Sequence, residues 1–288
     1  MAIALAPVYA VCYSAIKLGL AYAPPLRYGG LRAVVAGISL LVVLRLAGRA
    51  VFPPSRLWPG TAVIAVAGTL LAFAAMFSSP GRTGAGIASV LGNTTPLVIA
   101  ALAVPLLGET VSRAKAAALV LGVAGAALVA YPALTDPAHH GLAGALLPLT
   151  AAAGFAVSTV LFKRLDAKGA VLQVATWQLL LGGVPLLALS ALLEPQAAIE
   201  WNAAFVGLLL FLSVIGTALT TTVWYWLVQR DDVSRLSIAL FLVPALGLGV
   251  GVTLFDEPLD VPEIVGVVLV LAALAAIVLD GRRQREGS

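Results

Sequence analysis

Long apolar runs follow one another along the whole chain, separated by short breaks that carry charge or proline. Each run holds about the 20 residues that a helix needs to cross the hydrocarbon core of a bilayer. A helix satisfies its own backbone polar groups, which lipid cannot do, so we interpret each run as a transmembrane helix. The ten predicted spans are residues 2–20, 26–47, 58–78, 83–107, 111–131, 141–162, 169–192, 202–228, 233–254 and 260–280.

The second half of the chain repeats the first at an offset of 148 residues. Its clearest unit is a serine, a proline seven residues later and a glutamate thirteen residues after that. The two copies are Ser89, Pro96 and Glu109, and Ser237, Pro244 and Glu257. The same offset matches Gly68 and Thr69 with Gly216 and Thr217. Because five spans per half is an odd number, the two halves must enter the membrane in opposite directions.

The composition supports a chain built for lipid. Hydrophobic residues make up 61% of the sequence and charged residues 10%, whereas soluble domains carry roughly 25% charged residues. We therefore predict an all-α integral membrane protein of about ten transmembrane helices, arranged as two inverted five-helix repeats. The predicted units are an N-terminal repeat over residues 1–132, a C-terminal repeat over residues 141–281 and a cytoplasmic tail over residues 282–288.

The basic residues indicate how these spans are oriented. Thirteen of the seventeen Lys and Arg residues fall on one side of the predicted topology, and the positive-inside rule makes that side cytoplasmic. The other four are Lys17, Arg27, Arg32 and Arg82. We expect a multi-pass protein of a bacterial inner membrane with both termini in the cytoplasm. The net charge of +4 is spread singly between the spans, so we expect the lipid bilayer as a partner and no nucleic acid.

Taken together, these residues resemble the drug/metabolite transporter superfamily in its ten-helix EamA form. The resemblance rests on the repeated Ser-Pro-Glu unit, on Lys17 and Lys163 closing the first span of each half, and on Arg27 and Tyr28 opening the second span. The second half departs from it, with Asp256 before its glutamate and Thr176–Trp177 in span 7. The resemblance implies a carrier that exports amino acids or similar metabolites by alternating access, without ATP.

Ionisable residues offer little chemistry inside the predicted spans. All thirteen acidic residues lie in loops or at span ends, whereas proton-coupled pumps commonly carry a buried Asp, Glu or His. The chain has no G-x4-GK[ST] phosphate loop. We therefore expect a facilitator or exchanger, with no cofactor, no metal and no enzymatic activity.

Polar and aromatic residues within the spans are candidates for a substrate site, because a polar stripe facing lipid would lose its hydrogen bonds. Asn93 could bind the polar group of a zwitterion, and Trp177, near the predicted middle of span 7, could contact an apolar or aromatic substrate. Equally, Ser and Thr can bond to their own helix and Trp can simply pack. The candidate substrate-binding residues are Tyr13, Ser89, Asn93, Ser158, Trp177, Gln178, Thr220 and Trp224.

Two prolines occupy equivalent places in the inverted halves. Pro96 and Pro244 each remove a backbone donor and free a carbonyl four residues earlier, at Gly92 and Leu240. We interpret them as gating hinges, although two inherited bends that only shape packing would leave the same pattern. Other readings of the whole chain stay open at this point: an exporter of drugs or other metabolites, a membrane-embedded enzyme, or a channel. The oligomeric state is also open, a monomer included.

Overall fold

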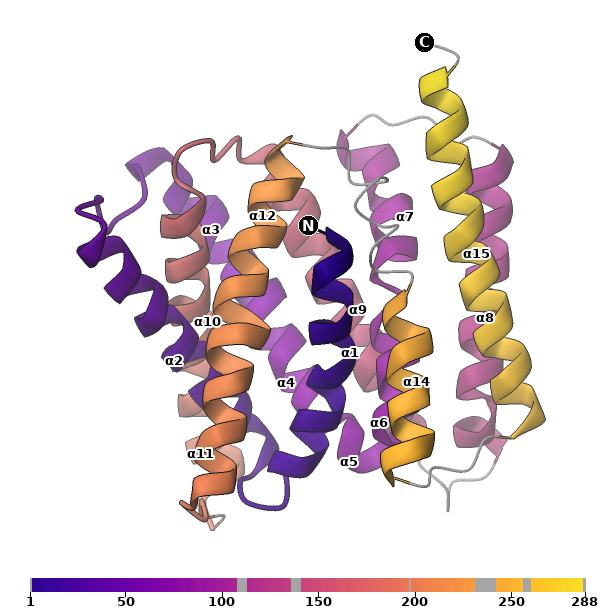
Figure 1. The fold of residues 1–288 in the computed structure, drawn as a ribbon, viewed down its shortest axis with the longest axis horizontal. Helices are drawn as coiled ribbons and strands as arrows, with labels where there is room; N and C mark the ends of the chain where they lie inside the picture. The colour runs from indigo at the N-terminus through magenta and orange to yellow at the C-terminus, as the bar shows by residue number, and fades with distance from the viewer. Residues whose placement is uncertain are drawn as a thin grey trace.

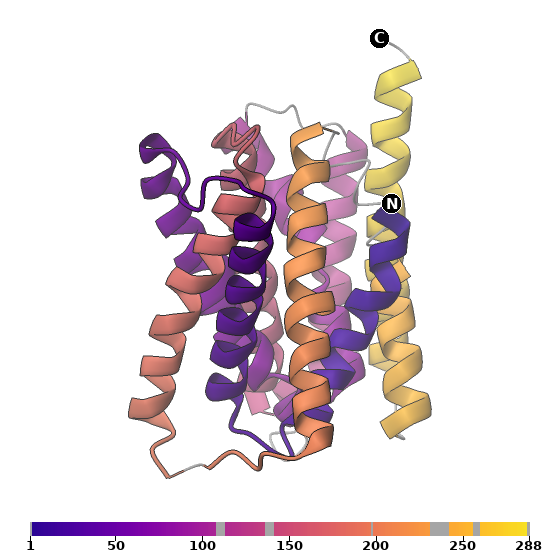
Figure 2. The ribbon, with the colours of Figure 1, turned by 60° about the vertical axis from the view of Figure 1, so that its left-hand side comes forward.

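The protein was analysed as a computed structural model that describes residues 2–107, 113–135, 141–196, 198–230, 242–255 and 260–286. Within these residues the chain is a bundle of helices that run side by side (Figures 1 and 2). Glu109, Ser237 and Glu257, on which the sequence repeat partly rests, lie outside the described residues.

The first half follows the predicted spans closely. Its third and fourth spans are each assembled from several helical pieces, of which η2 is a π-helix. The helices are α1 (Ala2–Gly19), α2 (Pro25–Leu46), η1 (Ser55–Leu57), α3 (Trp58–Ala65), η2 (Val66–Leu71), α4 (Ala72–Ser78), α5 (Pro80–Thr83), α6 (Ala85–Gly92), α7 (Thr95–Leu107) and α8 (Arg113–Thr135).

The second half repeats this order, with a second π-helix, η3, at the place equivalent to η2. Its described helices are α9 (Gly141–Arg164), α10 (Val171–Leu193), α11 (Ala203–Leu210), η3 (Phe211–Leu219), α12 (Thr220–Arg230), α14 (Leu242–Phe255) and α15 (Val261–Glu286). A helix is thus present in every predicted span. Within the described part of the chain, five continuous stretches are long and apolar enough to cross a membrane: Pro25–Leu46, Ser55–Thr83, Gly144–Arg164, Val171–Leu193 and Ala203–Arg230.

The two halves are related by inversion. In Figure 1 the third span descends from α3 to α4, whereas its counterpart rises from α11 to α12. Equivalent helices pack against each other, namely α2 with α10, α6 with α14 and α8 with α15. A Cβ on Gly37 would lie 2.7 Å from the Leu180 side chain, and one on Gly183 would lie 3.1 Å from Val34. At an offset of 146 residues, Gly37 is equivalent to Gly183 and Val34 is equivalent to Leu180. The two contacts are therefore the same contact, made once from each half.

The fourth span is broken where the sequence predicted only a bend. α6 ends at Gly92 and α7 begins at Thr95, so Pro96 lies in the first turn of α7. A proline there removes no helical hydrogen bond, because the first N–H groups of a helix have no partner within it. The Gly92 carbonyl accepts a hydrogen bond from the Thr95 hydroxyl at 3.1 Å. Pro244 likewise lies in the first turn of the described helix α14.

A carboxylate from the second half caps the start of α2. The Glu194 side chain, just beyond α10, accepts hydrogen bonds from the backbone N–H groups of Leu26 and Arg27 at 3.0 and 3.1 Å. The Arg27 guanidinium donates to the Ser190 hydroxyl and to the Glu194 carbonyl, at 3.3 and 3.1 Å. A negative charge at a helix N-terminus is stabilising. These contacts therefore connect the first turn of α2 to the end of α10.

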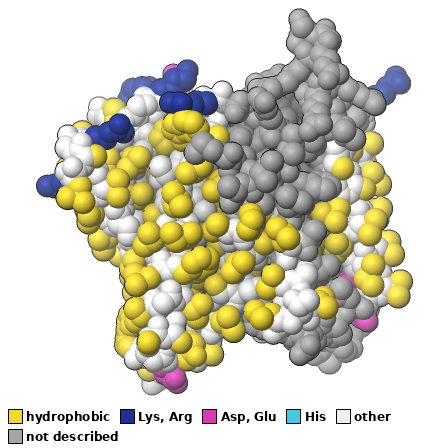
Figure 3. All heavy atoms as spheres, in the orientation of Figure 1, with side chains coloured by type: hydrophobic (Ala, Val, Ile, Leu, Met, Phe, Trp, Pro, Cys, Tyr) yellow, Lys and Arg dark blue, Asp and Glu magenta, His cyan; other side chains and the backbone are white. Residues whose placement is uncertain are grey.

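On the face shown in Figure 3, the described surface is divided into bands along the helix direction. Hydrophobic side chains cover its middle, most Lys and Arg residues lie toward the top, and most acidic residues lie toward the bottom. An apolar belt between two charged ends is the surface expected of a protein that crosses a bilayer.

Candidate functional site

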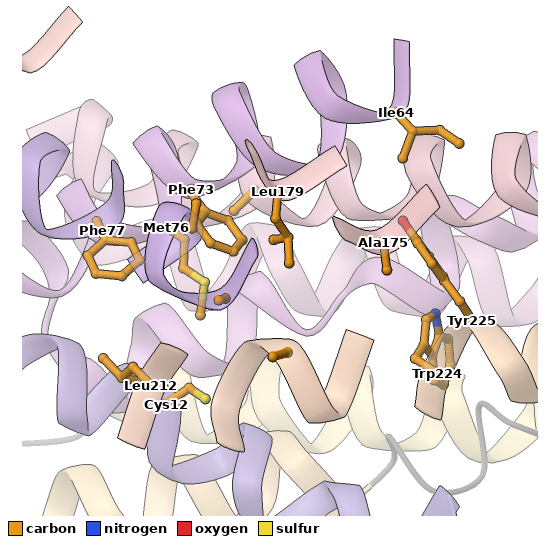
Figure 4. Packing of buried hydrophobic residues seen from close by; sticks show 14 of the residues in the cluster. Cys12, Ile64, Phe73, Met76, Phe77, Ala175, Leu179, Leu212, Trp224 and Tyr225 are labelled. Carbon is orange, nitrogen blue, oxygen red and sulfur yellow. The ribbon is translucent and has the colours of Figure 1, made fainter. Parts of the chain in front are cut away.

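A cavity of about 140 Å³ lies inside the bundle, between the two halves. Its walls come from α1, α2, η2, α4, the α6–α7 break, α9, α10, η3 and α12. Its walls combine apolar and aromatic side chains with polar ones, among them Arg32, Asn93, Gln178 and several Ser and Thr hydroxyls. Figure 4 shows part of the buried cluster around it, with Trp224 and Tyr225 at one end and Phe77 at the other.

Six of the eight candidate substrate-binding residues line this cavity. They are Tyr13, Asn93, Ser158, Gln178, Thr220 and Trp224, and they come from both halves of the chain. The remaining two, Ser89 and Trp177, are not among its lining residues. Sequence reasoning therefore gathered residues from five separate spans that the fold does bring together.

Ser89 supports Asn93 from one turn below. Its side chain is fully buried, and its backbone carbonyl accepts a hydrogen bond from the Asn93 side-chain amide at 2.7 Å. One Asn93 donor is thus used inside the helix break, where it holds the last turn of α6 together. The Asn93 side chain still borders the cavity.

The prediction for the position of Trp177 was wrong. Trp177 is the seventh residue of α10 rather than a residue near its middle. Its ring stacks on Phe52 with centroids 5.1 Å apart and contacts Trp58 at 5.2 Å. The indole N–H donates to the Val51 carbonyl at 3.0 Å. Trp177 therefore fastens the segment between α2 and α3 to α10, at the basic end of the bundle and away from the cavity.

Arg32 is the residue that sequence reasoning missed. It is only 3% exposed and lines the cavity from α2. Its Nε donates to the Thr217 hydroxyl, and its Nη2 donates to the Gly216 carbonyl at 3.0 Å. Its Nη1 has no hydrogen-bond partner among the residues that the structure describes.

A signal for Arg32 was present in the sequence. Arg32 stands between Leu31 and Ala33, well inside the predicted span 26–47. Ionisable residues within a membrane span are expensive and mark functional sites by default. Counting Arg32 with the basic residues of the loops hid that signal.

The guanidinium of Arg32 is also covered by aromatic rings. Its central carbon lies 5.1 Å from the centroid of Phe73 and 5.5 Å from that of Phe77. Both distances lie within the range of a cation–π attraction. The rings and the two fixed hydrogen bonds hold the planar group in one place, with Nη1 left unpaired.

The opposite end of the cavity carries neutral polar groups. The Gln178 side-chain amide donates to the Thr69 hydroxyl at 3.3 Å, and its carbonyl accepts from the Tyr225 hydroxyl. The Trp224 indole N–H donates to the Thr159 hydroxyl at 3.3 Å. These bonds fix the orientations of Gln178, Tyr225 and Trp224.

The two ends correspond under the internal repeat. Arg32 and Gln178 are offset by 146 residues, and each donates to one threonine of the matched pair Thr217 and Thr69. The π-helical glycines correspond as well. A Cβ on Gly216 would meet Cys12 and Arg32, and one on Gly68 would meet the residues equivalent to these two, Ser158 and Gln178. The site is thus one polar arrangement used twice, with a cation in only one copy.

Charge and metal-ligand chemistry are limited in the described part of the site. The residues that line the cavity there include Arg32 and no Asp or Glu. Among the described residues no three His, Cys, Asp or Glu side chains form a group that could hold a metal ion. The arrangement is suited to binding a small molecule that presents an anionic group to Arg32.

Comparison with known proteins gives a consistent result. The profile of the EamA-like transporter family matches residues 1–131 and 142–279. The "Uncharacterized transporter YvbV" of Bacillus subtilis is 28% identical over 93% of this chain and 87% of that protein. A "Probable amino-acid metabolite efflux pump" of Salmonella typhimurium is 27% identical over 99% of this chain and 96% of that protein. One solved crystal structure shares the fold with a TM-score of 0.70 at 18% identity, covering 98% of both chains.

Proposed function

The chain belongs to the EamA-like transporter family, and from that membership we propose that it exports small carboxylate-bearing metabolites, amino acids among them, by alternating access. The family has a ten-helix membrane fold. The observation that carries the proposal is the cavity between two inverted halves, lined by both and holding Arg32 as a fixed cation. Secondary transporters built from inverted repeats commonly place their substrate site at such an interface.

Two aromatic layers support alternating access. Toward the acidic end, Tyr28 contacts Phe77 and Phe205, with ring centroids 5.0 and 5.2 Å apart. Toward the basic end, Phe162 and Tyr225 stack face to face with centroids 3.8 Å apart. A carrier must close its site on one side before it opens on the other, and these two layers lie where such closures would be needed.

The charge distribution indicates how the protein is oriented in the membrane. Basic side chains gather at the top of Figure 3 and acidic side chains at the bottom. By the positive-inside rule the top is the cytoplasmic side. We propose an inner membrane location with both termini in the cytoplasm, so that export carries a substrate from the top of Figure 3 to the bottom.

The substrate assignment draws on the cavity and on the names of the relatives. Two relatives are named as probable amino-acid metabolite efflux pumps, in Salmonella typhimurium and in Escherichia coli. An apolar cavity with a few fixed polar groups suits a small molecule with one charged end and one apolar end. Drugs and other metabolites form the second candidate class, which the same assay covers.

The proposal is tested by uptake of labelled amino acids and drugs into proteoliposomes that contain the purified protein, with and without a pH gradient. We expect saturable amino-acid uptake that the gradient does not change. Gly216→Leu should fill the cavity beside Cys12 and Arg32 and lower uptake at least about tenfold, since it removes the space in which a substrate binds.

Gly207→Leu is the matched control. Gly207 lies on the same predicted span as Gly216, and a Cβ there would meet nothing within 4 Å. Uptake by this variant should stay within about twofold of the wild type, because substitutions that point into open space, away from the packed core and the cavity, are usually tolerated. If Gly216→Leu transported amino acids as well as Gly207→Leu does, the cavity would not be the transport site. If the wild type took up drugs but no amino acid, drugs would replace amino acids as the proposed substrate class.

A further inference from the structure

We propose that the cavity prefers monoanionic carboxylates that lack an ammonium group, such as 2-hydroxy acids, over zwitterionic amino acids. This inference rests on the proposed transport function and adds a charge class to it.

The described walls offer hydrogen-bond donors at Arg32 that nothing satisfies. A guanidinium has five N–H groups and is always charged. In Arg32 the Nε and Nη2 groups are bonded to Thr217 and to Gly216, and Nη2 also lies 3.9 Å from the Cys12 sulfur. The Nη1 group is itself covered by neighbouring atoms, and among the described residues its two N–H groups have no hydrogen-bond partner. A carboxylate oxygen is the acceptor that best satisfies such donors.

Three acceptors of the walls already take hydrogen bonds from neighbouring groups. The Gln178 carbonyl accepts from Tyr225, and the Thr159 hydroxyl accepts from Trp224. The Gly216 carbonyl accepts from both Arg32 and Thr220. An ammonium group carries three donors and no acceptor. At these three acceptors it would compete with bonds that already exist, whereas a hydroxyl group can donate one hydrogen bond and accept another.

The charge balance favours the same class. Within the described lining, Arg32 supplies one positive charge and no acidic side chain opposes it. A monoanion brings the cavity to neutrality, while a zwitterion leaves one positive charge uncompensated. In a low-dielectric interior an uncompensated charge is strongly unfavourable.

The broken symmetry of the site shows where the anion would bind. The two equivalent half-sites differ in that Arg32 stands where the other half has Gln178, and Cys12 stands where it has Ser158. Only one half therefore offers a cation. The carboxylate should lie against Arg32, with the neutral part of the molecule directed toward Gln178 and Trp224.

Three probes with one carbon skeleton separate the charge classes: 2-hydroxy-4-methylpentanoate, L-leucine and L-leucinamide. At neutral pH they are an anion, a zwitterion and a cation. Calorimetric titration of the purified wild-type protein with each probe should give a dissociation constant for the hydroxy acid at least about tenfold below that for L-leucine, with no measurable binding of L-leucinamide, a difference of about 1.4 kcal/mol or more.

The wild-type result alone decides the inference. L-leucine binding as tightly as the hydroxy acid would overturn the preference while leaving the proposed amino-acid transport intact. Tightest binding of L-leucinamide would overturn the role of Arg32 as an anion site. If neither carboxylate bound and no amino acid were taken up by proteoliposomes, the transport proposal itself would fail.

Variants then assign the preference to one residue. Arg32→Gln makes the two half-sites alike and should raise the dissociation constant of the hydroxy acid at least about thirtyfold. Arg32→Lys keeps the charge and should recover part of this loss. Arg82→Gln removes an exposed arginine outside the cavity and should change the constant less than about twofold. Unchanged hydroxy-acid binding by folded Arg32→Gln would overturn the assignment.

Discussion

Arg32 is held inside the protein by its neighbours rather than by an acidic residue of the described lining. Two hydrogen bonds, a sulfur contact and two aromatic faces surround its guanidinium. Arg32 is the eighth residue of the 22-residue helix α2, and an arginine at the very centre of a membrane helix costs about 3 kcal/mol in insertion experiments. A chain that retains such a residue in an apolar cavity must offset that cost, and binding an anionic substrate provides one way to do so.

Two tryptophans from the sequence prediction now have different expected roles. Trp177→Ala removes a ring that stacks on Phe52 at the surface end of α10, so it should lower the free energy of unfolding by roughly 1–3 kcal/mol. Its effect on the apparent KM for substrate should stay below about twofold. Trp224→Ala removes part of the cavity wall and should raise that KM about tenfold. Uptake kinetics and thermal unfolding measured on both variants check this.

A rise in KM for Trp177→Ala alone would return Trp177 to the site and contradict its placement.

The same pair of residues shows the limit of sequence reasoning at this scale. Periodicity places both tryptophans on helices but does not fix which face of a buried helix meets a cavity. That face is set by packing between helices that are distant in sequence, as with Trp177 and Val51.

The broken fourth span is the feature that matters most at the scale of the element. α6 and α7 are separated at Asn93 and Thr94, beside the cavity, and Pro96 is the second residue of α7. A break next to a binding site lets two half-helices move separately, which is a common arrangement in transporters. The sequence predicted a weak point here from Pro96, but the break itself also depends on Asn93 bonding back to Ser89.

Pro96→Ala should slow the transport cycle more than it weakens binding, because an added N–H allows α6 and α7 to join across the break. We expect turnover to fall at least about fivefold while the dissociation constant stays within about twofold. Pro185→Ala is the control, since Pro185 lies inside α10 at an exposed position. A loss of affinity with unchanged turnover would contradict the hinge.

The fold of the whole molecule was the most predictable part. Spans that must be apolar for about 20 residues leave a strong signal, and all ten predictions contain described helix. The repeat was also visible, because Gly68, Thr69, Gly216 and Thr217 recur at a fixed offset. Their function was not visible, since only the folded chain shows that the matched threonines accept hydrogen bonds from Arg32 and Gln178.

The repeat boundaries at residues 1–132 and 141–281 stay a prediction, as does the orientation of the termini. The two inverted halves support a mechanism in which the cavity opens to each side of the membrane in turn. Cys12, the only cysteine in the chain, reports on that directly because it lines the cavity. Its reactivity can be measured in the natural sequence, without any substitution.

The measurement that tests alternating access most directly is the rate at which a membrane-impermeant thiol reagent modifies Cys12 in right-side-out and in inside-out membrane vesicles. We expect modification from both sides, slowed from both sides by saturating 2-hydroxy-4-methylpentanoate, because one cavity is exposed in turn. If Cys12 were modified from one side only or from neither side, and the substrate did not change the rate, alternating access through this cavity would be contradicted.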